Sequence, residues 1–253
     1  MNIQQFKSCI GELFGQLLLD FQEDEEYGYS NFTAADYRTI GYATNLTPEI
    51  VQQAAQHKVD LIITHHDAWG FVYGMKERCM ALLEEHHIAH FYIHLPLDYA
   101  EFGTCHSLLR LLGANVVQQS QHVNGDSSIG IGELERSITL EQLAETMREL
   151  LGENIFVQPN SNRDVRRIGM VTGAGNSTNQ LKEAMESQCD VYITGEKTLY
   201  TVQYAKFIQM NLIVGSHTFT EIFGVRSLAC KIQEKFPDVE VIQLLEEHNE
   251  VMS

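Results

Sequence analysis

The sequence predicts an α/β protein composed of two related α/β lobes, residues 1–124 and 125–253. Apolar runs typical of strands alternate with runs typical of helices through most of the 253 residues. The alternation repeats, because residues 38–66 and 166–196 each read as strand, turn, helix and strand. In both halves a third strand then leads into a histidine that is followed four positions later by a carboxylate.

Agreement between individual positions supports the internal repeat. Residues 60–64 (DLIIT) match residues 190–194 (DVYIT), and Thr44 matches Thr172. The pair Thr47-Pro48 predicts a helix start in the first copy, because threonine caps helices and proline suits their first turn. Each copy is therefore expected to form one βαβ unit of a parallel sheet.

The remaining elements are predicted from the same patterns. Apolar residues at helical spacing indicate an amphipathic helix at the N-terminus, and the polar residues 113–128 indicate a loop at the lobe boundary. Further helices are expected near residues 75–87, 139–152, 197–208 and 221–235, and further strands at 90–94, 129–135, 155–158, 211–215 and 239–245.

The charge balance bounds the possible partners. With 17 basic and 34 acidic residues the formal net charge is -17, which opposes binding to nucleic acid or to an anionic membrane. No apolar run reaches the roughly 18 residues of a membrane-spanning helix, and Glu12 interrupts any signal-peptide core. Five scattered cysteines without a C-x-x-C pair are typical of reduced thiols, so we expect a cytoplasmic protein.

Three predicted strands end in histidine and carboxylate side chains. These are His65 and His66 after one strand, His94 and Asp98 after a second, and His217 and Glu221 after a third. Ligands of open α/β sheets collect beyond the carboxyl ends of parallel strands. We therefore expect these side chains to meet in one cleft if the strand ends of the two halves converge.

This set of donors favours two divalent metal ions as cofactors. Adjacent His65 and His66 leave the strand in different directions, so they suit two ions better than one. Positions i and i+4 share one face of a helix, so each His-x-x-x-carboxylate pair can reach a single cavity. Imidazole with carboxylate suits Zn, Mn, Fe or Ni better than Ca or Mg, and Glu221 can bridge two ions.

Other residues carry weaker signals. Glu196 occupies the position in the second copy that His66 has in the first, and reads as an outer acid, a base or a surface residue. The Gly173–Gly175 turn lacks the third glycine of a dinucleotide fingerprint, so it reads as a tight turn, with phosphate contact as the alternative. Trp69 either walls the cleft or lies in the core. The other histidines read as structural or surface residues: His57, His86, His87, His90, His106, His122 and His248.

Together the motifs resemble the NIF-three-like family, whose members are often described as GTP cyclohydrolase 1 type 2 homologues. The resemblance rests on five segments that fall in register between about residues 30 and 245. These segments are residues 64–66 (THH), 94–98 (HLPLD), 173–175 (GAG), 190–196 (DVYITGE) and 217–221 (HTFTE). In one departure, this chain has Gly103-Thr104-Cys105 where the family commonly has Gly-Asn-Asn, so any function of those asparagines is not carried over.

The resemblance implies two α/β lobes with a dinuclear metal site between them, in a ring-shaped homohexamer. It implies that the metal ligands are His65, His66, Asp98, His217 and Glu221. It also places His94 near the metals, as an outer or catalytic residue.

Two functions from different classes fit these residues. The first is metal-dependent hydrolysis of a nucleotide or related small molecule, such as opening of the purine ring of GTP, with His94 or Glu196 moving protons. The alternative is a non-catalytic metal-handling or regulatory scaffold, which closed metal coordination would favour. A third reading is a plain α/β protein whose histidines bind no metal.

Overall fold

A computed structural model describes residues 1–22, 25–123 and 126–250, which divide into two compact units. The first unit comprises residues 1–103 and 224–247, and the second comprises residues 104–223 with the chain from 248 onward. These units differ from the expected lobes because β5 (Ala114–Gln118) pairs with β8 (Gly130–Ile138) of the second sheet. The end of the chain returns to the first unit, where β13 (Glu240–Gln243) pairs with β2 (Thr39–Ala43).

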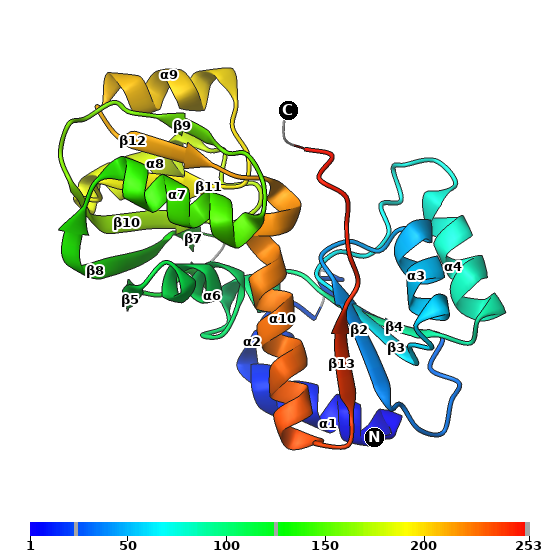
Figure 1. Cartoon of the computed structure of the whole chain (residues 1–253). Helices are drawn as coiled ribbons and strands as arrows, with labels where there is room; N and C mark the ends of the chain where they lie inside the picture. Colours follow the sequence, from blue (N-terminus) through cyan, green and yellow to red (C-terminus); the bar gives the residue numbers. More distant parts are fainter. Residues whose placement is uncertain (23–24, 124–125, 251–253) are drawn as a thin grey trace. The chain divides into compact units, whose positions relative to one another are not determined.

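The first unit holds a five-stranded sheet of order β1-β4-β3-β2-β13, in which β1 is antiparallel and the others are parallel (Figure 1). Its other elements are α1 (Ile3–Phe14), α2 (Gln16–Asp20), β1 (Tyr27–Ser30), α3 (Pro48–Gln56), β3 (Leu61–Thr64), α4 (Met75–Glu85), β4 (Ala89–Ile93), α5 (Leu95–Tyr99) and most of α10 (His217–Lys235). Helices α3 and α4 pack on the face that carries Ile62. Helix α1 packs on the other face, where the Phe6 and Phe91 ring centroids lie 5.2 Å apart.

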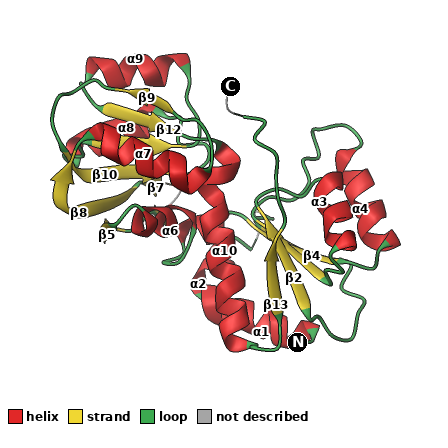
Figure 2. Cartoon of the chain, in the orientation of Figure 1, coloured by secondary structure: helices red, strands yellow, loops and turns green. Residues whose placement is uncertain are grey.

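The second unit holds a six-stranded sheet of order β5-β8-β10-β11-β12-β9, in which β10, β11 and β12 are parallel (Figure 2). Its other elements are α6 (Thr104–Leu111), β6 (Gln121–Val123), β7 (Asp126–Ser128), α7 (Leu140–Leu151), β9 (Phe156–Gln158), β10 (Val165–Val171), α8 (Thr178–Glu186), β11 (Val191–Thr194), α9 (Leu199–Phe207) and β12 (Asn211–Val214). Helices α8 and α9 share one core with Tyr192 and Leu212. The loop predicted over residues 113–128 is wrong where β5, β6 and β7 form, since strands at a sheet edge, such as β5, tolerate polar residues.

The internal repeat is present in three dimensions. Units β2-α3-β3 and β10-α8-β11 have the predicted order, and both strand pairs are parallel. The matched aspartates play the same structural role. The Asp60 carboxylate accepts backbone N–H groups of Arg38 and Thr39 at 2.7 and 2.9 Å. The Asp190 carboxylate accepts those of Arg166 and Arg167 at 3.0 and 2.9 Å. Each aspartate therefore fixes the start of the neighbouring strand, and with it the register of the βαβ unit.

Two further expectations concern the chain's helices. The N-terminal amphipathic helix is confirmed as α1, which Asn2 caps and which buries Phe6, Cys9, Ile10 and Phe14. Among the helices within the described residues, none combines the length and the apolar character needed to cross a bilayer.

One buried histidine predicts a specific acid sensitivity. His90 on β4 is fully buried, and its Nε2 lies 2.7 Å from Thr64 Oγ1. Burial lowers the pKa of His90 to about 4. Since the unfolded chain takes up this proton near pH 6.5, we expect His90 to reduce the free energy of unfolding as pH falls from about 6.5 to 4, by on the order of 3 kcal/mol.

Urea denaturation of the wild type and of His90→Gln at pH 7 and pH 4.5 checks this expectation. Glutamine keeps a donor for Thr64 but has no proton to gain, so the variant should lose less stability between the two pH values. Equal losses in both proteins would contradict the assignment.

Candidate metal centre

Three histidines meet at the carboxyl ends of β3 and β4 in the first unit. His65 and His66 directly follow β3, and His94 directly follows β4. One nitrogen from each ring lies within 4.8 Å of one nitrogen from each of the others, so this group can hold a metal ion. Parallel strands place their ends at one edge of a sheet, which explains why side chains from two separate strands come together.

Asp98 joins this cluster through the short helix α5. His94 precedes the helix and its carbonyl accepts the Asp98 N–H at 3.2 Å, so the His-x-x-x-Asp motif forms a helical turn. Asp98 Oδ1 consequently lies 3.4 Å from His65 Nε2. Four predicted site residues of the first half are thereby brought together, with carboxylate and imidazole side by side.

The second unit brings His217, Glu221 and Glu196 together. His217 begins α10 and Glu221 follows one turn later, which leaves His217 Nε2 3.3 Å from Glu221 Oε1. Glu196, after β11, approaches the other ring nitrogen, with Oε1 2.7 Å from His217 Nδ1. Burial alone would lower the pKa of His217, but Glu221 and then Glu196 outweigh it and raise this pKa to about 10. The two carboxylates thus favour positive charge on or beside the His217 ring, whether it is a proton or a metal ion.

The Gly173–Gly175 turn after β10 supports this cluster. Gly173 has a φ of +60°, and a Cβ placed on it would lie 1.9 Å from Glu221 Oε1 and 2.9 Å from His217 Nε2. Its N–H donates to the Thr220 hydroxyl at 3.0 Å, and its carbonyl accepts from Gly175 N–H at 3.0 Å. The segment is therefore a tight turn that lets the backbone approach the two side chains closely.

All four histidines direct Nδ1 to an oxygen acceptor. The acceptors are the Ile93 carbonyl at 2.9 Å from His65, Asn45 Oδ1 at 2.8 Å from His66, Glu26 Oε2 at 2.5 Å from His94, and Glu196 Oε1 at 2.7 Å from His217. An oxygen acceptor holds the proton on Nδ1, so the lone pair of each neutral ring lies on Nε2. This is the arrangement by which proteins prepare histidine to bind a metal.

Sequence reasoning missed two of these acceptors. Glu26 ends an acidic run, residues 23–26, that reads as solvated surface; residues 23 and 24 lie outside the described residues. Asn45 follows β2, so the rule that found His65 at the end of β3 also applies to it. A search of every strand end for amides, and not only for histidine and carboxylate, would have found Asn45.

Thr104 and Cys105 have structural contacts in the second unit. The Thr172 hydroxyl donates to Thr104 Oγ1 at 2.8 Å, and the Cys105 thiol donates to the Met170 carbonyl at 3.4 Å. Both side chains are buried. They consequently hold α6 against β10.

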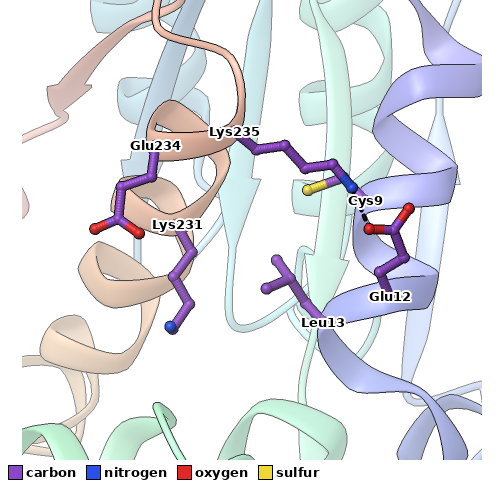
Figure 3. A pocket seen from close by; sticks show the side chains of 6 residues that line it. All are labelled: Cys9, Glu12, Leu13, Lys231, Glu234 and Lys235. Atoms are coloured by element: carbon purple, nitrogen blue, oxygen red, sulfur yellow. Dashed lines mark hydrogen bonds and ion pairs between the residues drawn. The ribbon is translucent and has the colours of Figure 1, made fainter.

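A cavity of about 400 Å³ lies apart from these histidines, between α1 and α10 of the first unit (Figure 3). Its walls are Cys9, Glu12, Leu13, Lys231, Glu234 and Lys235. Lys235 forms an ion pair with Glu12, and burial raises the pKa of the Cys9 thiol. None of these six residues is a candidate metal ligand, so the cavity is not part of the centre described above.

The sequence is similar to proteins of one known family. Residues 19–250 match the family model described as Duf34/NIF3 (NGG1p interacting factor 3). A Yersinia pestis protein named GTP cyclohydrolase 1 type 2 homolog is 26% identical over 223 residues, covering 85% of this chain and 87% of the relative. A Haemophilus influenzae protein of the same name is 29% identical, over 71% of this chain and 73% of the relative.

Solved structures share the fold. TTHA1606 from Thermus thermophilus superposes with a TM-score of 0.80 at 24% identity, covering 98% of this chain and 100% of that one. Reduced HcgD from Methanocaldococcus jannaschii has a TM-score of 0.77 at 20% identity, covering 96% and 98% of the two chains. A Bacillus cereus protein related to NIF3 has a TM-score of 0.79 at 16% identity, covering 100% and 99%. At these identities the likeness establishes the fold.

Proposed function

Because the chain belongs to the Duf34/NIF3 family, we propose that it is a dinuclear metal-dependent hydrolase of a nucleotide or related small molecule. The proposed ligands of the two divalent ions are His65, His66, Asp98, His217 and Glu221. Zn, Fe, Mn and Ni are the ions that such a set of imidazole and carboxylate donors suits. The name shared by the curated relatives supports a nucleotide as substrate.

The common orientation of the histidines carries this proposal. Each candidate ring has its Nδ1 proton held by an oxygen acceptor, which leaves Nε2 as the donor atom. The three rings therefore offer the same nitrogen to a metal ion.

Each outer residue has a separate role in this proposal. Bound ions of this class supply Lewis-acid activation of water and of a substrate oxygen. Glu196 orients His217, because one of its oxygens takes Nδ1 and the other accepts the Asn176 amide at 2.6 Å. The proton carrier is then His94, whose half-exposed ring contacts the Glu26 carboxylate at 2.5 Å and can exchange protons with substrate.

An aromatic surface beside His66 supports a planar substrate. The Trp69 ring lies 4.7 Å from the His66 ring and 5.4 Å from the Phe71 ring, measured between centroids. Trp69 is partly exposed, and Phe71 is 75% exposed. A nucleobase stacked on Trp69 would therefore be held next to the metal ligands.

We further propose that the protein forms a cytoplasmic homohexamer, as expected from the sequence. Helix α9 packs one side on the second sheet through Ala205, yet its outer side carries Leu199 and Phe207 at 76% and 83% exposure. A helix that is apolar on both sides is typically covered on both sides. A neighbouring subunit would supply the second cover.

Elemental analysis of protein prepared without a histidine tag, combined with a nucleotide turnover panel, tests the function. We expect up to two divalent ions per chain in the wild type. His66→Ala and Glu221→Ala should each weaken metal binding more than the roughly 10–100-fold that loss of an outer partner costs, and should abolish turnover. The control is His57→Ala, which removes an exposed histidine.

Three outcomes separate the alternatives. Metal loss with lost turnover in both variants, and native circular dichroism, would support the hydrolase. Stoichiometric metal with no turnover across the panel would contradict it and favour the metal-handling scaffold. Sub-stoichiometric metal in the wild type would contradict any metal-dependent function. Quenching of Trp69, the single tryptophan, reports binding of a planar substrate independently of turnover.

A further inference from the structure

The chain beyond β13 leads to the same sheet edge as the histidines of the first unit. The Leu244 N–H donates to the Tyr42 carbonyl at 2.9 Å, so the pairing with β2 continues past the strand. Leu244 is fully buried, and a Cβ on Gly41 would lie 2.8 Å from its Cδ1. Glu246, two residues later, is consequently held at the carboxyl end of β2.

The Glu246 carboxylate faces three N–H groups there. Its Oε2 accepts the Thr44 backbone N–H at 2.7 Å, and its Oε1 accepts the Asn45 backbone N–H at 3.0 Å. Its Oε1 also accepts the Asn45 side-chain amide, Nδ2, at 2.8 Å. These contacts involve both carboxylate oxygens, so the side chain is held in position. It presents only hydrogen-bond acceptors to the end of β2.

This polarity decides the orientation of the Asn45 amide. A carboxylate accepts hydrogen bonds, so it draws the Asn45 NH₂ group toward itself and turns Oδ1 the other way. Oδ1 lies 2.8 Å from His66 Nδ1 and accepts its proton. Were the amide reversed, its NH₂ group would face His66 Nδ1 and favour the tautomer that carries the proton on Nε2. The orientation of one amide therefore sets which nitrogen of His66 is available.

We propose that Glu246 is a positioning residue of the metal centre, which acts through Asn45 to hold His66 in the tautomer whose Nε2 binds metal. The metal half of this inference rests on the proposed function, whereas the tautomer half does not. Partners of this outer kind typically change metal affinity about 10–100-fold when removed.

Four variants test the relay. Glu246→Ala removes the carboxylate, and Glu246→Gln replaces one of its two acceptor oxygens with an NH₂ group. Asn45→Asp places two carboxylates together. The double variant, Asn45→Asp with Glu246→Gln, reverses the polarity of the pair: the new glutamine amide donates to the new aspartate, whose other oxygen remains for His66 Nδ1. Glu247→Gln is the matched control, since Glu247 is the exposed neighbour and the charge change equals that of Glu246→Gln.

Two measurements follow each variant. Nitrogen-15 NMR of the metal-free protein reports the His66 tautomer, and isothermal titration with Zn²⁺ reports affinity. We expect the wild type and Glu247→Gln to carry the proton on Nδ1. Glu246→Ala should lose that preference and bind Zn²⁺ about 10–100-fold more weakly, and Glu246→Gln should change in the same direction. Asn45→Asp should keep the preference, because a carboxylate at position 45 can only accept the His66 Nδ1 proton. The double variant should recover roughly tenfold of that loss, as coupled partners do.

The outcomes separate this inference from the proposed function. A wild type that binds no Zn²⁺ would overturn the proposed function, while the tautomer measurement would still decide the relay. Unchanged tautomer and affinity in Glu246→Ala would overturn the relay alone. If Glu246→Ala does not fold, the comparison of Glu246→Gln with the double variant decides, because general loss of stability would not be repaired by a second substitution.

Discussion

Gly173→Ala is expected to lose metal affinity in the second unit by at least roughly 100-fold, the upper end of what an outer substitution costs. The added methyl group would lie 1.9 Å from Glu221 Oε1 and 2.9 Å from His217 Nε2, so both side chains must move. Zn²⁺ titration by calorimetry measures the loss. Retained affinity would contradict the assignment of His217 and Glu221 as ligands.

The control for this variant separates collision from backbone strain. Gly113 has a φ of +80°, also lies in the second unit, and has no atom within 4 Å of an added Cβ. Gly113→Ala therefore carries only the cost of a left-handed alanine, about 1–2 kcal/mol of unfolding free energy. Its Zn²⁺ affinity should equal that of the wild type.

Gly103→Ala should destabilise the first unit by about 3 kcal/mol or more. A Cβ on Gly103 would lie 1.7 Å from the Leu97 carbonyl oxygen and 2.9 Å from that of Ala100. These are backbone atoms, so a change of side-chain rotamer cannot relieve the collision. Since Leu97 precedes Asp98 in α5, a shift of α5 that relieves the collision would also move Asp98 relative to His65. Urea denaturation measures the loss of stability.

Gly70→Ala is the matched control for Gly103→Ala. Gly70 is exposed, belongs to the same unit, and has no atom within 4 Å of an added Cβ. Its substitution should leave the unfolding midpoint within experimental error. Equal midpoints for the two variants would show that α5 can shift without cost.

The sequence predicted the site best where a short apolar strand ends directly before a histidine or a carboxylate. Four-residue apolar strands such as residues 61–64 and 191–194 are buried along their whole length, as parallel strands are. Their carboxyl ends must lie at one edge, so the grouping of His65 with His94 was predictable from the order of elements alone. The contact of Glu196 with His217 follows from the same rule in the second unit.

Contacts that depend on the far end of the chain were not predictable in this way. Glu246 belongs to a tail that reads as solvated surface, yet it is partly buried and binds the end of β2. Nothing in residues 239–250 indicates that the last strand joins the first sheet beside β2 and not the second. The unit boundaries could not be predicted from the sequence for the same reason. Strand pairing between distant residues depends on tertiary packing and not on local pattern.

The duplicated halves also bear on how this protein can change by substitution. Position 195 in the second copy corresponds to His65 in the first, but a Cβ on Gly195 would lie 2.7 Å from Thr220 Oγ1 and 2.8 Å from the Gly173 carbonyl. No larger residue fits there while α10 begins where it does. The histidine pair of the first half therefore cannot be placed at the equivalent position of the second half unless the start of α10 moves.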